Sequence, residues 1–111
     1  MKRTKIFLLH ILESIERIED FTKGFSKDDF LQSEKTQDAV LRRLEIIGEA
    51  VKNISANFKK KHAEVEWKKI AGARDIIIHE YFGVDLDLTF RIIKKNIPEL
   101  KQKIKELLKN L

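Results

Sequence analysis

The chain has 111 residues, a formal net charge of +5 at neutral pH and no cysteine. This length fits a single domain over residues 1–111 with one hydrophobic core. The lack of cysteine excludes disulfides, thiolate metal sites and a cysteine nucleophile. The excess of positive charge permits a polyanionic partner such as nucleic acid but does not require one.

Apolar runs in the chain are short. The longest, such as residues 76–78, are far shorter than a membrane span. The N-terminus is basic, but Glu13 and Glu16 interrupt the apolar stretch behind it, which excludes a secretory signal peptide. We therefore expect a cytoplasmic protein with no membrane association.

Two long helices are predicted in the first half of the chain, because apolar residues recur there at steps of three and four. The first stripe ends at Gly24, which can stop a helix in the left-handed conformation. Ser26 and Asp29 then have the spacing of a capping box, which predicts a short helix. The second long helix is expected to start between Ser33 and Thr36. The two stripes consist of Leu8, Ile11, Ile15, Ile18 and Phe21, and of Val40, Leu44, Ile47, Val51 and Ile54.

The sequence pattern in the second half of the chain predicts three further helices. Residues 57–61 are expected to form a basic loop, followed by a third helix from residues 65–67 to about Tyr81. Asp85 can cap a fourth helix, and Pro98 is tolerated in the first turn of a last one. No segment alternates as a strand does. The fold class expected is all-α, an up-and-down bundle of four to five helices.

Arg74 interrupts the apolar face of the predicted third helix, at a position where the helical period predicts an apolar residue such as leucine. An unpaired buried guanidinium would cost several kcal/mol, as an order of magnitude. One interpretation is therefore structural: Arg74 pairs with a core carboxylate such as Glu45 or Glu49, or its side chain extends outward to solvent. The other is that Arg74 belongs to a functional site.

His79 and Tyr81 follow Arg74 closely in the sequence. On one regular helix Arg74 and Tyr81 would share a direction, while His79 would point about 140° away. Asp75 lies four residues before His79, where a carboxylate could orient the imidazole. A single histidine is most often a hydrogen-bonded structural residue. An arginine, a histidine and a tyrosine at one helix end together favour a site that handles phosphate.

The remaining signals are weaker. His10 and His62 have no partners at metal-ligand spacing, so we expect no metal site. The basic residues 59–61 and the row Lys101, Lys105 and Lys109 are typical of solvated faces, although they could also contact nucleic-acid phosphates.

The order of Arg74, four residues, His79, one residue and Tyr81 resembles the signature of the HEPN superfamily. The flanking segments 34–40 (EKTQDAV), 44–50 (LEIIGEA) and 74–85 (RDIIIHEYFGVD) are similar to those of its HepT-like branch, in the same order. The resemblance extends from about residue 7 to residue 104. Asp75 is a departure, because many relatives carry asparagine there.

The resemblance implies a HEPN-like helical homodimer that acts as the toxin of a toxin–antitoxin pair. The implied activity is metal-independent RNA cleavage, without a cofactor, by Arg74 and His79 as catalytic residues. The implied partner is a small, MntA-like nucleotidyltransferase antitoxin that silences the toxin by AMPylation of Tyr81. Asp75 is a supporting residue in this interpretation.

The chemistry of RNA cleavage independently suggests that two copies of the chain form one site. Attack of the RNA 2′-hydroxyl on the adjacent phosphate needs a proton acceptor, a proton donor and a cation. One chain offers one histidine in this region, so a two-fold dimer would supply the second. The alternative is a non-catalytic subunit that binds nucleotide, RNA or the nucleotidyltransferase, with Arg74 holding phosphate without cleaving it. A purely structural bundle with an ion-paired Arg74 is the third possibility.

Overall fold

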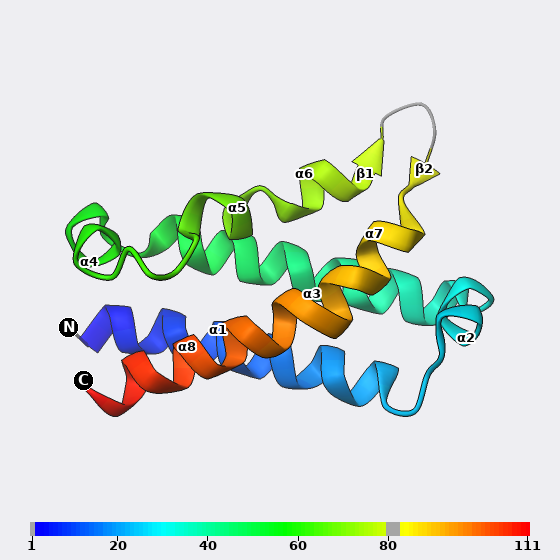
Figure 1. Ribbon diagram of the computed structural model, residues 1–111. Helices are drawn as coiled ribbons and strands as arrows, with labels where there is room; N and C mark the ends of the chain where they lie inside the picture. The colour runs from blue at the N-terminus through cyan, green and yellow to red at the C-terminus, as the bar shows by residue number, and fades with distance from the viewer. Residues whose placement is uncertain (1, 80–82) are drawn as a thin grey trace.

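The computed structural model describes residues 2–79 and 83–111 (Figure 1). In chain order its elements are α1 (Lys2–Thr22), α2 (Lys27–Leu31), α3 (Glu34–Asn53), α4 (Ala56–Lys61), α5 (Trp67–Ala71), α6 (Ala73–Ile77), β1 (Ile78–His79), β2 (Gly83–Val84), α7 (Leu86–Arg91), the π-helix η1 (Ile92–Asn96) and α8 (Ile97–Lys109).

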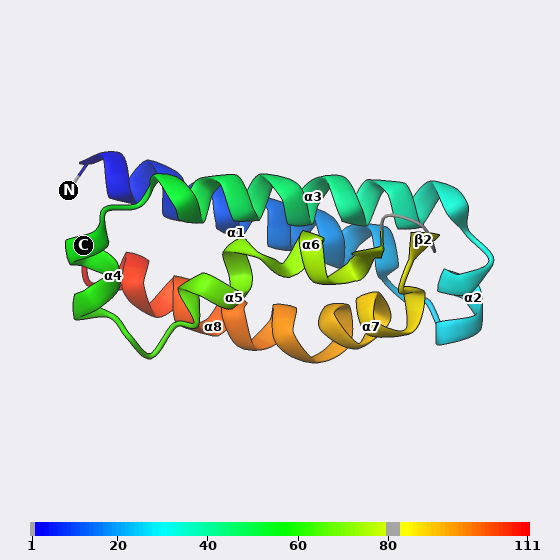
Figure 2. The same cartoon turned by 90° about the horizontal axis from the view of Figure 1, so that it is seen from above.

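The helices form four arms that run alternately in opposite directions: α1, α3, α5 with α6, and α7 with η1 and α8 (Figures 1 and 2). Helix α1 packs on α3 and α8, and α3 also contacts α5 and α6. Both termini lie at one end of the bundle, and α2 and the β1–β2 pair lie toward the other. The predicted all-α, up-and-down fold is confirmed, but its four arms are divided into eight α-helices and one π-helix among the described residues, more than the four to five helices predicted.

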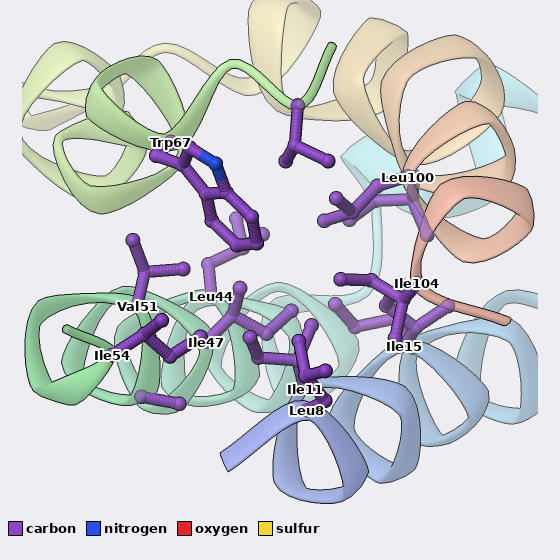
Figure 3. Packing of buried hydrophobic residues seen from close by; sticks show 14 of the residues in the cluster. Leu8, Ile11, Ile15, Leu44, Ile47, Val51, Ile54, Trp67, Leu100 and Ile104 are labelled. Atoms are coloured by element: carbon purple, nitrogen blue, oxygen red, sulfur yellow. The ribbon is translucent and has the colours of Figure 1, made fainter. Parts of the chain in front are cut away.

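The core lies where the apolar stripes of α1, α3 and α8 meet (Figure 3). Leu8, Ile11 and Ile15 of α1 are fully buried, and Ile47 and Ile104 face them from α3 and α8. Each such side chain contributes roughly 1.5–3 kcal/mol through burial. Among the described residues, no helix combines the length and hydropathy that crossing a bilayer requires.

Most predicted helix ends are confirmed by capping contacts. The Ser26 side chain accepts a hydrogen bond from the Asp29 backbone N–H at 3.1 Å, and the Ser26 N–H donates to the Asp29 carboxylate at 3.0 Å. Asp85 accepts from the Leu88 N–H at 3.0 Å and caps α7. Gly24 has φ +76°, the left-handed conformation expected after α1. These local signals set where helices begin and end, independently of the rest of the fold.

The prediction of one continuous third helix to Tyr81 is wrong. The helix breaks at Gly72 into α5 and α6, and α6 ends at Ile77. The Ile77 carbonyl accepts a hydrogen bond from the Asp85 N–H at 2.8 Å, which joins it to the β1–β2 pair rather than to a further helical turn. Residues 76–78 are all isoleucine, which favours extended backbone. In the pair, Ile78 lies opposite Val84 and His79 opposite Gly83.

The prediction of a basic loop over residues 57–61 is also wrong, because this segment belongs to α4. Ser55 caps the helix by accepting from the Phe58 N–H at 3.2 Å, and Phe58 is buried in the core. One buried aromatic residue and a cap are thus sufficient to order a segment whose lysines suggested a solvated loop.

The two predicted C-terminal helices form one continuous arm. The backbone stays helical from α7 through η1 into α8, and the Ile97 N–H donates to the Ile92 carbonyl five residues earlier. Pro98 follows directly; it has no N–H to donate and its ring crowds the carbonyl four residues earlier. The wider π turn places the extra backbone length just before this proline.

Candidate active site

Arg74 lies in α6, directly before the β1–β2 pair. Its side chain is 44% exposed, and its Nε lies 2.9 Å from Oε2 of Glu45 on α3. Arg74 therefore does not lie on a buried apolar face, as its place in the apolar period suggested; its side chain extends outward beside α3, and Ile77 is buried instead. The predicted carboxylate partner is confirmed as Glu45.

Glu45 joins two arginines. Its Oε1 accepts a hydrogen bond from Nη1 of Arg42 at 2.9 Å, while its Oε2 meets Arg74. Arg42 was not anticipated as part of this cluster, although its position three residues before Glu45 on one helix is the spacing of a side-chain pair. Two guanidinium groups and one carboxylate give this three-residue cluster one net positive charge.

The contact between α3 and α5 is unusually close and fixes where α6 begins. A Cβ built on Gly48 would lie 3.1 Å from the carbonyl oxygen of Ala71. The small residues at 71–73 permit this close backbone approach, and Gly48 is their partner on α3. Because Gly48 is three residues after Glu45, the same stretch of α3 positions both the backbone and the guanidinium of the α5–α6 arm.

The structure places the backbone of His79 in β1, opposite Gly83. Since α6 ends at Ile77, Asp75 and His79 do not lie on one continuous helix, and Asp75 is not one helical turn below His79. Asp75 is exposed in the first turn of α6. Tyr81 lies outside the described residues.

An apolar groove of about 350 Å³ opens beside this arm, between α3, the α5–α6 arm and the α7–η1–α8 arm. Ile76, two residues after Arg74, lines it and is 54% exposed. At the rim, the Lys69 ammonium lies 2.8 Å from the Glu66 carboxylate, and this hydrogen bond lowers the pKa of Glu66. The apolar lining consists of Leu44, Ile47, Val65, Ile70, Ala73, Ile76, Leu88, Ile92, Ile97 and Leu100.

No group of three or more potential metal ligands occurs among residues 2–79 and 83–111. His62 lies beside Glu64, with 3.6 Å between Nδ1 and the carboxylate. The ring of His10 packs edge-on against Phe7.

Comparison with known proteins identifies relatives along nearly the whole chain. Residues 11–107 match the HepT-like family, described as "Ribonuclease HepT-like". The chain is 50% identical over 110 residues to a Thermococcus cleftensis protein named "Probable ribonuclease HepT", covering 98% of this chain and 100% of the relative. It is 47% identical over 108 residues to a "Putative RNase" of Caldanaerobacter subterraneus subsp. tengcongensis, covering 97% and 96% of the two chains.

A third relative is longer. The chain is 53% identical over 110 residues to a Methanocaldococcus jannaschii protein named "Gamma-glutamylcyclotransferase and putative RNase", and it spans 99% of its own length but only half of that relative. No solved structure matches the chain. The family match and the near-complete coverage of the other two relatives show that this chain belongs to the HepT-like ribonuclease family of the HEPN superfamily.

Proposed function

We propose that this protein is a ribonuclease that cleaves RNA without a metal ion, with Arg74 and His79 as its catalytic residues. The observation that carries the proposal is the Arg74 guanidinium, half exposed and held by Glu45, in a chain of the HepT-like family. A fully buried structural ion pair would leave no face of this guanidinium for a substrate. At 44% exposure, the side chain retains a face that can meet phosphate.

The reaction begins when the RNA 2′-oxygen attacks the adjacent phosphorus, and the bond from phosphorus to the 5′-oxygen breaks. The 2′-hydroxyl loses its proton to a base, and the leaving 5′-oxygen receives one from an acid. The products are a 2′,3′-cyclic phosphate and a 5′-hydroxyl. His79 performs one proton transfer, and Arg74 stabilises the charge that builds up on the phosphate oxygens.

The test is an assay of purified protein on labelled RNA in EDTA. We expect cleavage to persist under chelation and to leave a 2′,3′-cyclic phosphate or its 3′-phosphate product. His79→Ala is expected to reduce the rate by about 10²–10⁴-fold, the usual contribution of a proton-transfer group. Loss of wild-type cleavage in EDTA, restored by Mg²⁺, would contradict the mechanism. A His79→Ala protein as active as wild type would remove His79 from the site.

The second proton-transfer group is proposed to come from a second copy of the chain in a two-fold homodimer. The apolar groove supports this, because it lies on the arm that carries Arg74 and its rim residue Ile76 is exposed. A two-fold interface is self-complementary, so the groove faces of both copies would cover each other and bring both α6 helices together.

Ile76→Asp is expected to convert the dimer to a monomer and to abolish cleavage, because it places a charge in the apolar interface. Light scattering at micromolar concentration measures the mass. The matched control is Leu9→Asp, which changes a similarly exposed residue of α1 that does not line the groove. A monomeric wild-type protein with full activity, or dissociation by Leu9→Asp but not by Ile76→Asp, would refute this arrangement.

We also propose that the ribonuclease is the toxin of a toxin–antitoxin pair, with an MntA-like nucleotidyltransferase as its antitoxin and Tyr81 as the site of AMPylation. Family membership supports this proposal. The competing function is a non-catalytic subunit that binds RNA or the nucleotidyltransferase through the same basic surface. The two differ in the RNase assay, because only the enzyme loses a measurable cleavage rate when His79 is replaced.

A further inference from the structure

Glu45 takes part in more ion pairs than an ordinary surface carboxylate. Each of its two oxygens meets a different arginine at 2.9 Å, Arg42 on its own helix and Arg74 on the neighbouring arm. Both arginines and Glu45 are partly exposed, at 68%, 44% and 38% of their side-chain surface respectively. The cluster therefore lies where a substrate can reach it.

We propose that Glu45 is the positioning residue that orients Arg74 for the phosphate undergoing cleavage, an inference that rests on the proposed ribonuclease function. The Glu45 carboxylate lies against the Nε side of the guanidinium, with 2.9 Å between Oε2 and Nε. The Nη1 and Nη2 groups can then donate two parallel hydrogen bonds to two phosphate oxygens, the geometry in which arginine binds phosphate best.

Holding the Arg74 side chain in one orientation should raise the rate of cleavage. A long arginine side chain that is free to rotate must be ordered each time the transition state forms, whereas one already held in place is not reorganised at that moment. Arg42 fixes the other oxygen of Glu45, so the carboxylate itself has a defined direction. The close contact between Gly48 and Ala71 keeps the two helices at a constant separation beside it.

The charge balance remains favourable for RNA. Two guanidinium groups and one carboxylate leave one positive charge, so Glu45 does not cancel the attraction of the cluster for a phosphodiester. Removing the Glu45 charge should therefore strengthen ground-state attraction of RNA while weakening catalysis. A fall in kcat without a rise in KM distinguishes a positioning role from a merely structural salt bridge.

The test compares Glu45→Gln with Glu49→Gln in the cleavage assay. Glu49 is the matched control, because it lies one turn further along α3, is exposed, and its nearest ion-pair nitrogen, on Lys52, is 3.9 Å away. We expect Glu45→Gln to lower kcat roughly 10- to 100-fold, the size of effect expected from a misplaced catalytic group, with KM unchanged or lower. Glu49→Gln should retain wild-type kcat, and both should keep wild-type helicity.

A second measurement does not depend on activity. In protein labelled with ¹⁵N-arginine, the Nε–Hε signal of Arg74 should be observable in wild type and Glu49→Gln, and lost through faster exchange in Glu45→Gln. An Nε–Hε signal that is the same in all three proteins would overturn the inference, even if the chain does not cleave RNA.

The remaining outcomes separate the inference from the proposed function. Wild-type kcat in Glu45→Gln, with activity lost in Arg74→Ala, would overturn the positioning role and leave the ribonuclease intact. A higher kcat/KM in Glu45→Gln would show that Glu45 only masks Arg74. Loss of the acidic limb from the pH profile of kcat/KM would assign Glu45 to proton transfer instead of positioning.

Discussion

Arg74→Ala is expected to reduce RNA cleavage about 10²–10³-fold, the cost of losing one preorganised donor to a developing anion. The fold should survive the change. Arg74 is 44% exposed, and an exposed salt bridge such as the one it forms with Glu45 contributes about 0–1 kcal/mol to stability. The rate is measured on labelled RNA in EDTA, and far-ultraviolet circular dichroism reports the helicity of the same samples.

The matched control is Arg42→Ala, which removes the other arginine bound to Glu45. Because Arg42 lies outside the signature and is more exposed, its loss should lower the rate about tenfold or less, through a less firmly held Glu45. Equal losses in both variants would indicate that general positive charge, rather than a defined guanidinium, drives catalysis. Wild-type cleavage by Arg74→Ala would remove Arg74 from the active site.

The apolar periodicity of the sequence was sufficient to predict the bundle. Except for Phe21, which is only partly buried, the stripes of α1 and α3 are buried as predicted, because each is long enough for its helical period to be unambiguous. Caps such as Ser26 and Asp85 were also predictable, since they act within three residues of sequence. These are local properties of the chain.

The α5–α6 arm was not predictable in the same way. Its residues have helical spacing, but the break at Gly72 depends on the backbone of α3, which Ala71 approaches at Gly48. The end of α6 depends on Asp85, whose N–H binds the Ile77 carbonyl from eight residues further along the chain. Neither Gly48 nor Asp85 lies within residues 65–81, so no pattern in that segment contains these contacts.

In the candidate site, too, some features could be predicted from the sequence and others depend on how the helices pack. That Arg74 pairs with a carboxylate could be predicted from its charge, and Glu45 and Glu49 were the candidates named from the sequence. Which of them binds is decided by how α6 crosses α3, and the structure selects Glu45. The role of Arg42 appears only when Glu45 is seen to bind on both of its oxygens.

AMPylation of Tyr81 by a partner nucleotidyltransferase is expected to abolish RNA cleavage. The modification attaches a phosphodiester with a negative charge seven residues after Arg74 and two after His79. Such a group would compete with the RNA phosphate for the guanidinium, by the same charge effect through which phosphorylation acts on nearby arginines.

The chain makes the test unusually clear, because Tyr81 is its only tyrosine. Co-expression with an MntA-like nucleotidyltransferase, followed by intact mass spectrometry, should show added AMP on the wild-type chain and none on Tyr81→Phe. The purified wild-type protein should then be inactive, whereas Tyr81→Phe from the same co-expression should cleave RNA at the unmodified rate. If Tyr81→Phe still gains AMP, or is still silenced without gaining it, the control of this ribonuclease acts through a different residue or through binding of the partner alone.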